Sequence, residues 1–482
     1  MQFNSYIFVL AFLPITILLY FLANRRNIQA GKFVIIIASF IFYSYTDISV
    51  AKILIISCVI NYLFSKLIKR FNTRKKLLLG VPVLVNVGLL IYYKYTNFAI
   101  ININQWFSKS MELKDLVLPI GISFFTFQQI SYCISIYNET LEPDIIDYLA
   151  YILYFPKILM GPLMDPLDFS QQINDEGLKK INWENIANGL KIFSFGLFKK
   201  LILADTFAKA VEWGFVYIDY ATSMDFLLVM LFYTFEIYFD FSGYSDMATG
   251  SSLMLNITLP INFNSPYKAM SIRDFWKRWH MSLTGFLTKN VYIPLGGNKK
   301  GMTRTCINTL IVFVVSGIWH GANWTFILWG ILHGVFSVLE RIFEKLEKKI
   351  FEPVRWFVTF GIVNLLWLLF RAQNISQWIF IIKRILLFQD MNISTDLIYD
   401  FVTVEVSYLC SEFNFLQTIT DKIHGFWLII YVLLGYVICL IPENNYKRLK
   451  NNSYIEMFFA ALLFIWAFIS LGNESTFVYL GF

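Results

Sequence analysis

The sequence predicts an all-α protein that crosses a membrane many times. Of its 482 residues, 57% are hydrophobic and only 15% are charged, which is more apolar surface than a soluble domain of this length needs. The apolar residues also form continuous runs, many of them about 18 residues or longer, the length of a transmembrane helix. The alternating pattern of a membrane β-barrel is different. We therefore expect about eleven to thirteen transmembrane or re-entrant helices.

Each helix is predicted from one run of apolar residues. Nine runs predict spans, at roughly 5–23, 51–65, 77–93, 148–164, 223–241, 306–332, 355–371, 425–441 and 453–471. Shorter or polar-interrupted runs predict further spans or re-entrant segments, at 33–46, 117–137 and 186–204. Polar stretches between these runs predict soluble insertions, at 95–115, 166–185 and 389–422.

Basic residues gather in two loops near the N-terminus. Arg25, Arg26 and Lys32 follow the first run, and a denser group occupies about 66–76. Loops rich in Lys and Arg stay in the cytoplasm, so both loops are predicted to be cytoplasmic and the N-terminus to lie outside. The formal net charge of +7 therefore fits topology and contact with anionic membrane lipid, and it gives little support to a nucleic-acid partner.

No metal site or disulfide framework is predicted. The five cysteines are scattered, mostly inside apolar runs, and no CxxC pair occurs. Asp240 and Asp246 have no further carboxylate or histidine at ligand spacing. We interpret the cysteines as small buried residues.

The stretch from about 236 to 305 interrupts the apolar pattern with polar residues, Gly and Pro. It contains YFDFSGYSDMATG, LPINFNSPY, SIRDFWKRWHMSL and YIPLGGNKKG. Irregular backbone at membrane depth survives only where protein buries it or where it lines a water-filled cavity. The stretch therefore predicts an embedded chamber made from broken and re-entrant helices.

Three of the four histidines fall within one 54-residue window, at 280, 320 and 333. His320, in VVSGIWHGANW, follows a long apolar run, and Gly317 and Gly321 beside it would leave the backbone open to a substrate. An ionisable residue in a membrane segment indicates function, although a buried structural histidine is the competing interpretation. His333 would lie about 20 Å further along one continuous helix and on another face, so we expect it to be a packing residue, and His424 to be uninvolved.

The segment FWKRWHMSL at 275–283 places cations beside His280. If 272–283 is helical, Arg273, Lys277 and His280 share one face, which would suit the phosphates of a donor. Asp274 and Arg278 stand four residues apart in the favourable order for an ion pair.

A membrane-interface helix would explain the same segment. Its basic residues would extend to lipid headgroups, and Trp276 and Trp279 would be interfacial tryptophans. Spacing alone slightly favours this interpretation over a donor site.

The segments around these histidines resemble the membrane-bound O-acyltransferase family, in particular its bacterial branch of alginate and peptidoglycan O-acetyltransferases. The resemblance runs nearly from end to end and includes LPIGISFFTFQQISYCISIY at 118–137 and IYFDFSGYSDMATG at 237–250. Its most specific segments are LPINFNSPYKAMSIRDFWKRWHMSLTGFLTKNVYIPLGG at 259–297 and SGIWHGANWTFILWGILHG at 316–334.

The resemblance implies a fold of many helices around a central tunnel in the bacterial cytoplasmic membrane. N-terminal helices would occupy 1–115, a catalytic core 116–345 and C-terminal helices 346–482. The family's invariant histidine corresponds to His320, the expected general base, and a second polar position corresponds to His280. The expected donor is acetyl-coenzyme A or a carrier thioester, with Arg273, Lys277, Arg278 and Trp279 as its contacts.

The activity implied is transfer of an acetyl group to a hydroxyl of an extracytoplasmic polysaccharide or cell-wall polymer. A separate extracytoplasmic partner of the SGNH serine-esterase type is expected, since this chain has no such domain. Three alternatives stay open: D-alanyl transfer to teichoic acid from a carrier protein, a transporter or lipid flippase without chemistry, and a scaffold. A transporter would predict inverted repeats, which the sequence does not show.

Overall fold

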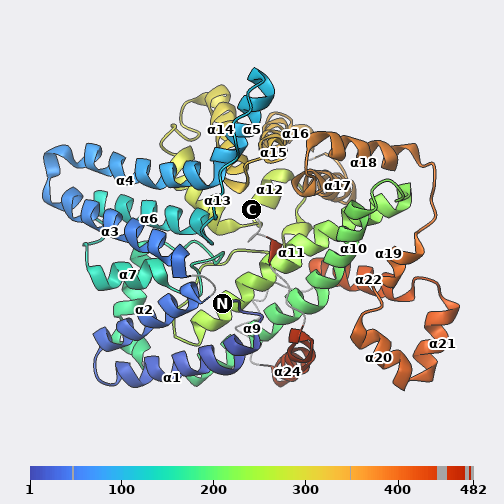
Figure 1. The fold of residues 1–482 in the computed structure, drawn as a ribbon, viewed down its shortest axis with the longest axis horizontal. Coiled ribbons are helices and arrows are strands. Elements are labelled where there is room, and N and C mark those ends of the chain that lie inside the picture. The colour runs from blue at the N-terminus through green and yellow to red at the C-terminus, as the bar shows by residue number, and fades with distance from the viewer. Residues whose placement is uncertain (46–47, 348, 442–452, 473–476, 479–482) are drawn as a thin grey trace. The chain divides into compact units, whose positions relative to one another are not determined.

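The structure is a computed structural model that describes residues 1–482 except 46–47, 348, 442–452, 473–476 and 479–482. Within the described residues every regular element is a helix, which confirms the predicted all-α class (Figure 1). Seven of these helices are long and apolar enough to cross a membrane, or eight if a pair bent by 95° counts as one span. The protein is therefore a multi-pass membrane protein. The predicted shorter or re-entrant segments at 33–46, 117–137 and 186–204 coincide with further, shorter helices.

The chain forms two compact units, which we describe separately. Unit 1 comprises Met1–Leu197, Tyr244–Ile261 and Ser453–Phe482, and unit 2 comprises Phe198–Gly243 and Asn262–Asn452. Helix α11 (Ser223–Leu253) contributes residues to both units. Apolar and polar side chains along α11 are almost all buried, as expected for a helix that is packed on every side.

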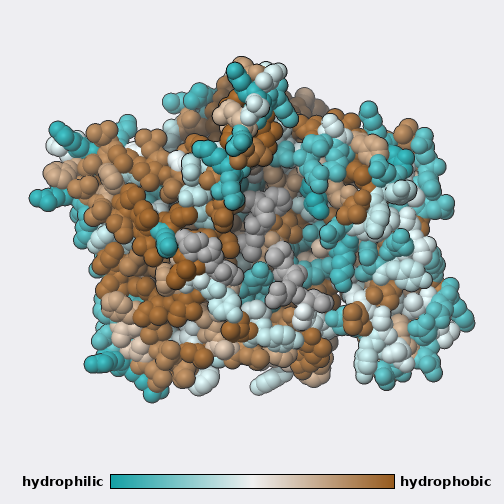
Figure 2. Space-filling view, viewed as in Figure 1, coloured by the Kyte–Doolittle hydropathy of each residue, from teal (hydrophilic) through white to brown (hydrophobic). Residues whose placement is uncertain are grey.

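Unit 1 is built mainly from antiparallel helices that follow one another along the chain. They are α1 (Leu13–Asn24), α2 (Ile28–Ser44), α3 (Ile48–Arg70), α4 (Lys75–Leu90), α5 (Thr96–Phe107), α6 (Ile122–Tyr137), α7 (Ile145–Leu153), α8 (Pro166–Asn174), α9 (Trp183–Phe198) and α24 (Tyr454–Ile469). Large apolar side chains remain exposed on several of these helices, among them Leu18, Ile37, Leu63 and Leu84. Figure 2 shows apolar residues over α1 to α4, with polar residues at the helix ends. These faces suit contact with lipid.

Unit 2 contains the other helices and the segments with the candidate site. They are α10 (Asp205–Val216), α12 (Ile272–Trp276), α13 (Met281–Leu287), α14 (Gly301–His320), α15 (Trp324–Ile342), α16 (Glu344–Glu347), α17 (Glu352–Arg371), α18 (Ile375–Leu387), α19 (Thr395–Tyr399), α20 (Val404–Glu412), α21 (Asn414–Lys422) and α22 (Phe426–Leu440). Helix α15 packs against α14, α12 and α17, so it is central to the site.

The predicted single span at 306–332 is wrong, because the structure has two helices there. Helix α14 ends at His320, and α15 begins at Trp324 after the Asn323 side chain caps it by accepting from the Thr325 amide at 3.1 Å. The two helices pack against each other as a hairpin. The apolar run hides this break, because only Gly321 and Asn323 mark it.

Three further predictions differ from the structure. The predicted span at 148–164 is helical only to Leu153, and the non-helical residues that follow include Pro156 and Pro162, which disfavour a helix. The predicted insertion at 95–115 is helical as far as Phe107. The polar motif at 237–250 lies inside continuous α11, so the broken region begins only after Leu253.

Candidate active site

His280 lies at a sharp break between two short helices. Helix α12 ends at Trp276, and α13 begins at Met281, with His280 between them at φ 44° and ψ 51°. This left-handed conformation is strained for a residue with a side chain, and such strain persists only where surrounding contacts enforce it. The helix conjectured for 272–283 is therefore not continuous, and Arg273, Lys277 and His280 do not share one helical face.

Asn262 fixes the orientation of the His280 ring. The imidazole is fully buried, and its Nδ1 lies 3.1 Å from Asn262 Oδ1. Ser282 Oγ donates to the same oxygen at 2.9 Å, and the Met281 amide donates to the Asn262 carbonyl at 2.9 Å. Because Oδ1 is an acceptor, Nδ1 carries the ring proton and Nε2 keeps its lone pair. Burial lowers the pKa of His280 to about 3, so the ring is neutral at pH 7.

His320 is the last residue of α14, at the turn of the α14–α15 hairpin. It is 3% exposed and lies among aromatic rings. The ring centroids of Trp319, Trp329 and Phe370 lie 4.9, 5.1 and 5.3 Å from that of the imidazole. The ring is thus fixed by packing on several sides, the condition for a precisely oriented base.

The glycines beside His320 serve helix packing and not the substrate approach expected from the sequence. A Cβ at Gly317 would lie 2.4 Å from the Phe326 carbonyl oxygen and 3.2 Å from the Gly330 Cα. A Cβ at Gly321 would lie 2.1 Å from the Phe326 ring. Small residues at these points let the two hairpin backbones approach closely, as in other membrane helix pairs.

His333 was expected to lie far from His320, and that expectation is wrong because the helix breaks between them. His333 Nδ1 accepts a hydrogen bond from Trp276 Nε1 at 3.1 Å. Its ring is 4.7 Å from that of Trp329, which also contacts His320. His333 Nε2 is buried and has no hydrogen-bond partner within the described residues.

Two indoles connect the three histidines. Trp319 contacts His280 and His320, with ring centroids at 6.2 and 4.9 Å, and Trp329 contacts His320 and His333. The structure therefore brings both sequence-predicted catalytic histidines to one aromatic cluster and adds a third.

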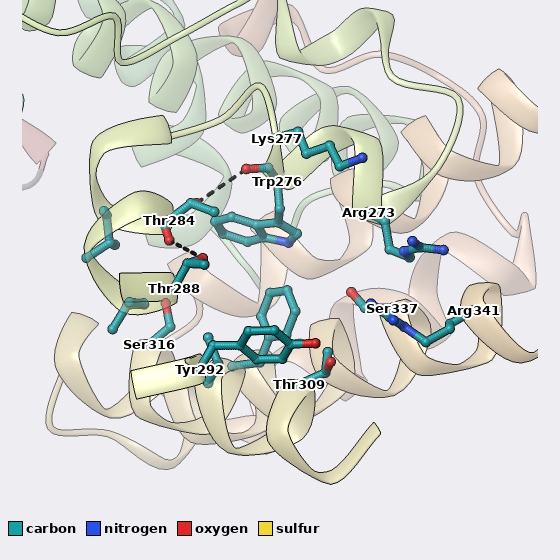
Figure 3. A pocket seen from close by; sticks show the side chains of 14 residues that line it. Arg273, Trp276, Lys277, Thr284, Thr288, Tyr292, Thr309, Ser316, Ser337 and Arg341 are labelled. Atoms are coloured by element: carbon teal, nitrogen blue, oxygen red, sulfur yellow. Dashed lines mark hydrogen bonds between the residues drawn. The ribbon is translucent and has the colours of Figure 1, made fainter. Parts of the chain in front are cut away.

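A pocket of about 240 Å³ lies beside this cluster, between α12, α13, α14 and α15 (Figure 3). One side carries three cations, Arg273, Lys277 and Arg341, and the opposite side carries apolar groups and hydroxyls. Ser316, one helical turn before His320, and Trp276, the partner of His333, both line it. The pocket thus extends along α14 from a cationic region toward the histidines.

Only two of the four predicted donor contacts line this pocket, namely Arg273 and Lys277. Arg278 is ion-paired with Asp274, its Nε lying 3.0 Å from Oδ1, as the spacing predicted. Trp279 is fully buried and packs against other rings, with Trp367 at 4.8 Å. Neither Arg278 nor Trp279 is among the residues that line the pocket. Their contacts therefore support a structural role better than a donor contact.

Sequence reasoning missed three residues of this site. Asn262 lies eighteen positions before His280, and no local spacing pairs the two. Arg341 in the last turn of α15 could have been identified as a cation ending an apolar run. Trp276 was considered only as an interfacial residue in the competing interpretation, whereas its indole is buried against His333.

His424 lies elsewhere in unit 2, away from the three clustered histidines. It lines a separate pocket of about 430 Å³ with Asp421, Thr420 and Trp427, at the junction of α21 and α22. That position agrees with the expectation that His424 takes no part in the histidine cluster.

The sequence matches one protein family model and is similar to several known proteins. The family model described as MBOAT, membrane-bound O-acyltransferase family, matches residues 40–388. The peptidoglycan O-acetyltransferase of Helicobacter pylori is 35% identical over the whole chain and 97% of its own length. The "Probable alginate O-acetylase AlgI" of Pseudomonas aeruginosa is 35% identical over 78% of this chain and 73% of its own. The teichoic acid D-alanyltransferase of Streptococcus thermophilus is 29% identical over 54% of this chain and 69% of its own.

Proposed function

Because this chain belongs to the membrane-bound O-acyltransferase family and is an O-acyltransferase, we propose that it transfers an acetyl group to a hydroxyl of an extracytoplasmic glycan. The acceptor would be a polysaccharide or cell-wall polymer, the class of substrate named for its two similar relatives. The membrane would be the bacterial cytoplasmic membrane. One observation carries the proposal: a cation-bordered pocket extends along α14 to within one turn of His320.

The cationic side of the pocket suits the anionic head of a thioester donor. Arg273, Lys277 and Arg341 lie together on that side, and guanidinium and ammonium groups bind phosphate by charge-assisted hydrogen bonds. The apolar and hydroxyl-bearing remainder suits an uncharged arm that leads toward Ser316. Acetyl-coenzyme A, or an acetylated carrier with a phosphopantetheine arm, has this division of charge.

Basic residues at one end of the α14–α15 hairpin indicate which side of the membrane the cationic side of the pocket faces. Lys299 and Lys300 precede α14, and Arg341 lies in the last turn of α15, so all three belong to the hairpin end opposite His320. By the positive-inside rule this end would be cytoplasmic. The donor would thus enter from the cytoplasm, and the acceptor hydroxyl would reach His320 from the other side.

His320 would act as general base. Its imidazole would accept the proton of the acceptor hydroxyl while that oxygen attacks the thioester carbonyl. The new C–O bond forms, the C–S bond breaks, and the proton passes to the departing thiolate. General-base assistance of this kind contributes about 10²–10⁴-fold to a rate.

His280 would assist as a neutral ring held by Asn262. It contacts the same indole as His320, so it can set the orientation of the catalytic imidazole or the polarity around the reacting carbonyl. Its buried position fits a fixed, uncharged group in a site where charge develops.

The test is acetyl transfer in vesicles by the purified full-length chain, supplied with labelled acetyl-coenzyme A, its polymer acceptor and the proposed SGNH-type partner. His320→Ala should lower kcat by about 10²–10⁴-fold. His424→Ala is the matched control, because that histidine lies in another pocket, and it should retain normal activity. Near-normal transfer by His320→Ala would exclude His320 as the base.

The same system identifies the acyl group and the partner. Incorporation of labelled D-alanine instead of acetate would replace the acetyl proposal by the D-alanyl one, which the more distant relative represents. An SGNH serine-esterase-like protein is proposed to pass the acetyl group to the glycan. Transfer that needs an added protein of this type supports that step, and direct transfer to the polymer by this chain alone would remove it.

A further inference from the structure

A third and larger pocket lies in unit 1, at the turn between α1 and α2. It has a volume of about 820 Å³ and combines this turn with the segment Glu176–Ile181. Four of its lining residues are cations and one is an anion. They are Arg25, Arg26, Lys179 and Lys180, with Glu176. The proposed acyl transfer makes no use of this pocket.

Within the described residues, none of the four cations of this pocket forms an ion pair with a carboxylate. Arg25 and Arg26 are exposed, and no ion pair involves either of them within the part of the chain that the structure describes. Lys179 is 8% exposed, and its Nζ donates to the uncharged oxygens Tyr20 Oη and Gln172 O at 3.2 and 3.1 Å. The carboxylates of Asp175 and Asp147 act on Lys179 only at longer range, without an ion pair, and Lys32 opposes them, so an anionic ligand would further stabilise this cation.

The N-terminus of α2 adds positive potential to the same pocket. Asn27 caps this 17-residue helix by accepting from the Ala30 amide at 2.7 Å, and Ile28 and Gln29 of its first turn line the pocket. Backbone N–H groups at a helix N-terminus attract anions. The helix N-terminus and the side-chain cations therefore both favour an anion in this pocket.

The pocket lies where lipid headgroups would be found. Helices α1 and α2 pack as a hairpin, and their outward side chains include Leu18 at 60% and Ile37 at 59% exposure. Figure 2 shows the polar turn of this hairpin at the end of an apolar face. A polar, basic turn that ends two lipid-facing helices is expected at the membrane–water boundary, on the cytoplasmic side.

We propose that the pocket formed by Arg25, Arg26, Lys179 and Lys180 binds a phosphate ester, and that its ligand is the headgroup of an anionic phospholipid. Arg25 and Arg26 contact the phosphate from the open side, and Lys179 lies at the buried side. The bound headgroup fixes the first helical hairpin at the membrane surface. A soluble phosphate has the same chemistry, and the experiment separates the two sources.

The experiment measures lipid binding by native mass spectrometry on the purified full-length chain in detergent. The probes are phosphatidylglycerol, zwitterionic phosphatidylcholine and inorganic phosphate. The pocket variant is the double substitution Arg25→Gln/Arg26→Gln. The matched control is Arg74→Gln/Lys76→Gln, which removes the same charge from two exposed cations of the second basic loop in unit 1.

We expect the pocket variant to bind phosphatidylglycerol about 30-fold more weakly than wild type, the factor that two cations at an anionic surface supply. The control should bind normally, and inorganic phosphate should not displace the lipid. Displacement by inorganic phosphate, with the same dependence on Arg25 and Arg26, would support the phosphate site and assign it to a soluble ligand. Equal loss in both variants, or no loss in either, would overturn the proposal.

Discussion

Replacement of Asn262 by alanine tests whether the orientation of His280 matters for catalysis. Asn262 Oδ1 lies 3.1 Å from His280 Nδ1, and the imidazole is fully buried, so water cannot take the place of the lost acceptor. Leaving a buried donor unsatisfied costs about 1–3 kcal/mol. If that energy is lost from the transition state, kcat falls about 5- to 150-fold. The Michaelis constant for the donor should change little, because Asn262 is not among the residues that line the pocket with Arg273 and Lys277.

The control for this variant is Ser282→Ala. Its hydroxyl donates to the same Asn262 oxygen at 2.9 Å, but its loss leaves the contact with the imidazole in place. We expect Ser282→Ala to lower kcat by no more than about fivefold, since a typical hydrogen bond contributes about 1 kcal/mol. Acetyl transfer is measured with saturating donor, and the thermal midpoint reports folding. Normal kcat in Asn262→Ala, or the same loss in both variants, would refute the reasoning.

Three other predictions concern packing, donor binding and pH. Gly317→Ala should lower the thermal midpoint, because its Cβ would lie 2.4 Å from the Phe326 carbonyl oxygen, whereas Gly361→Ala, with nothing within 4 Å, should not. Arg341→Gln should raise the Michaelis constant for an anionic donor about five- to tenfold at unchanged kcat, because one charge-assisted contact is lost. Burial lowers the pKa of His280 below its value in the unfolded chain, so between the two values the unfolded chain binds one more proton than the folded chain. Stability should therefore fall as the pH drops below about 6.5. Thermal midpoints measured at pH 5 and pH 7.5 should differ less for His280→Asn than for wild type.

The apolar runs of the sequence predict the class of the fold and many individual helices. The predicted span at 355–371 corresponds to α17, and that at 51–65 lies within α3. These helices are continuous and have no competing breaks, so length and apolarity suffice to predict them. The candidate histidines could also be found, because an ionisable residue in an apolar run is rare enough to indicate function by itself.

The geometry of the site depends on contacts that sequence patterns do not carry. The break after His320 is marked only by short polar residues within an apolar run, and the left-handed conformation of His280 depends on Asn262, a distant partner. Tertiary contacts of this kind override local propensity. His333 is a packed helix residue as expected, but the expected distance from His320 was wrong because it assumed one unbroken helix.

The distance between the cations and His320 determines which donors can react. Arg341 lies twelve residues after Trp329, which contacts His320, so an anionic head near Arg341 is roughly 18 Å along the helix from the catalytic ring. A donor must therefore carry its acyl group on an extended arm of about that length. Acetyl-coenzyme A has such an arm, whereas acetyl phosphate carries its acetyl group beside its charge. We expect labelled acetyl-coenzyme A to support transfer and acetyl phosphate to fail at equal concentration. Comparable rates from both donors would show that the cationic side of the pocket does not position the donor head.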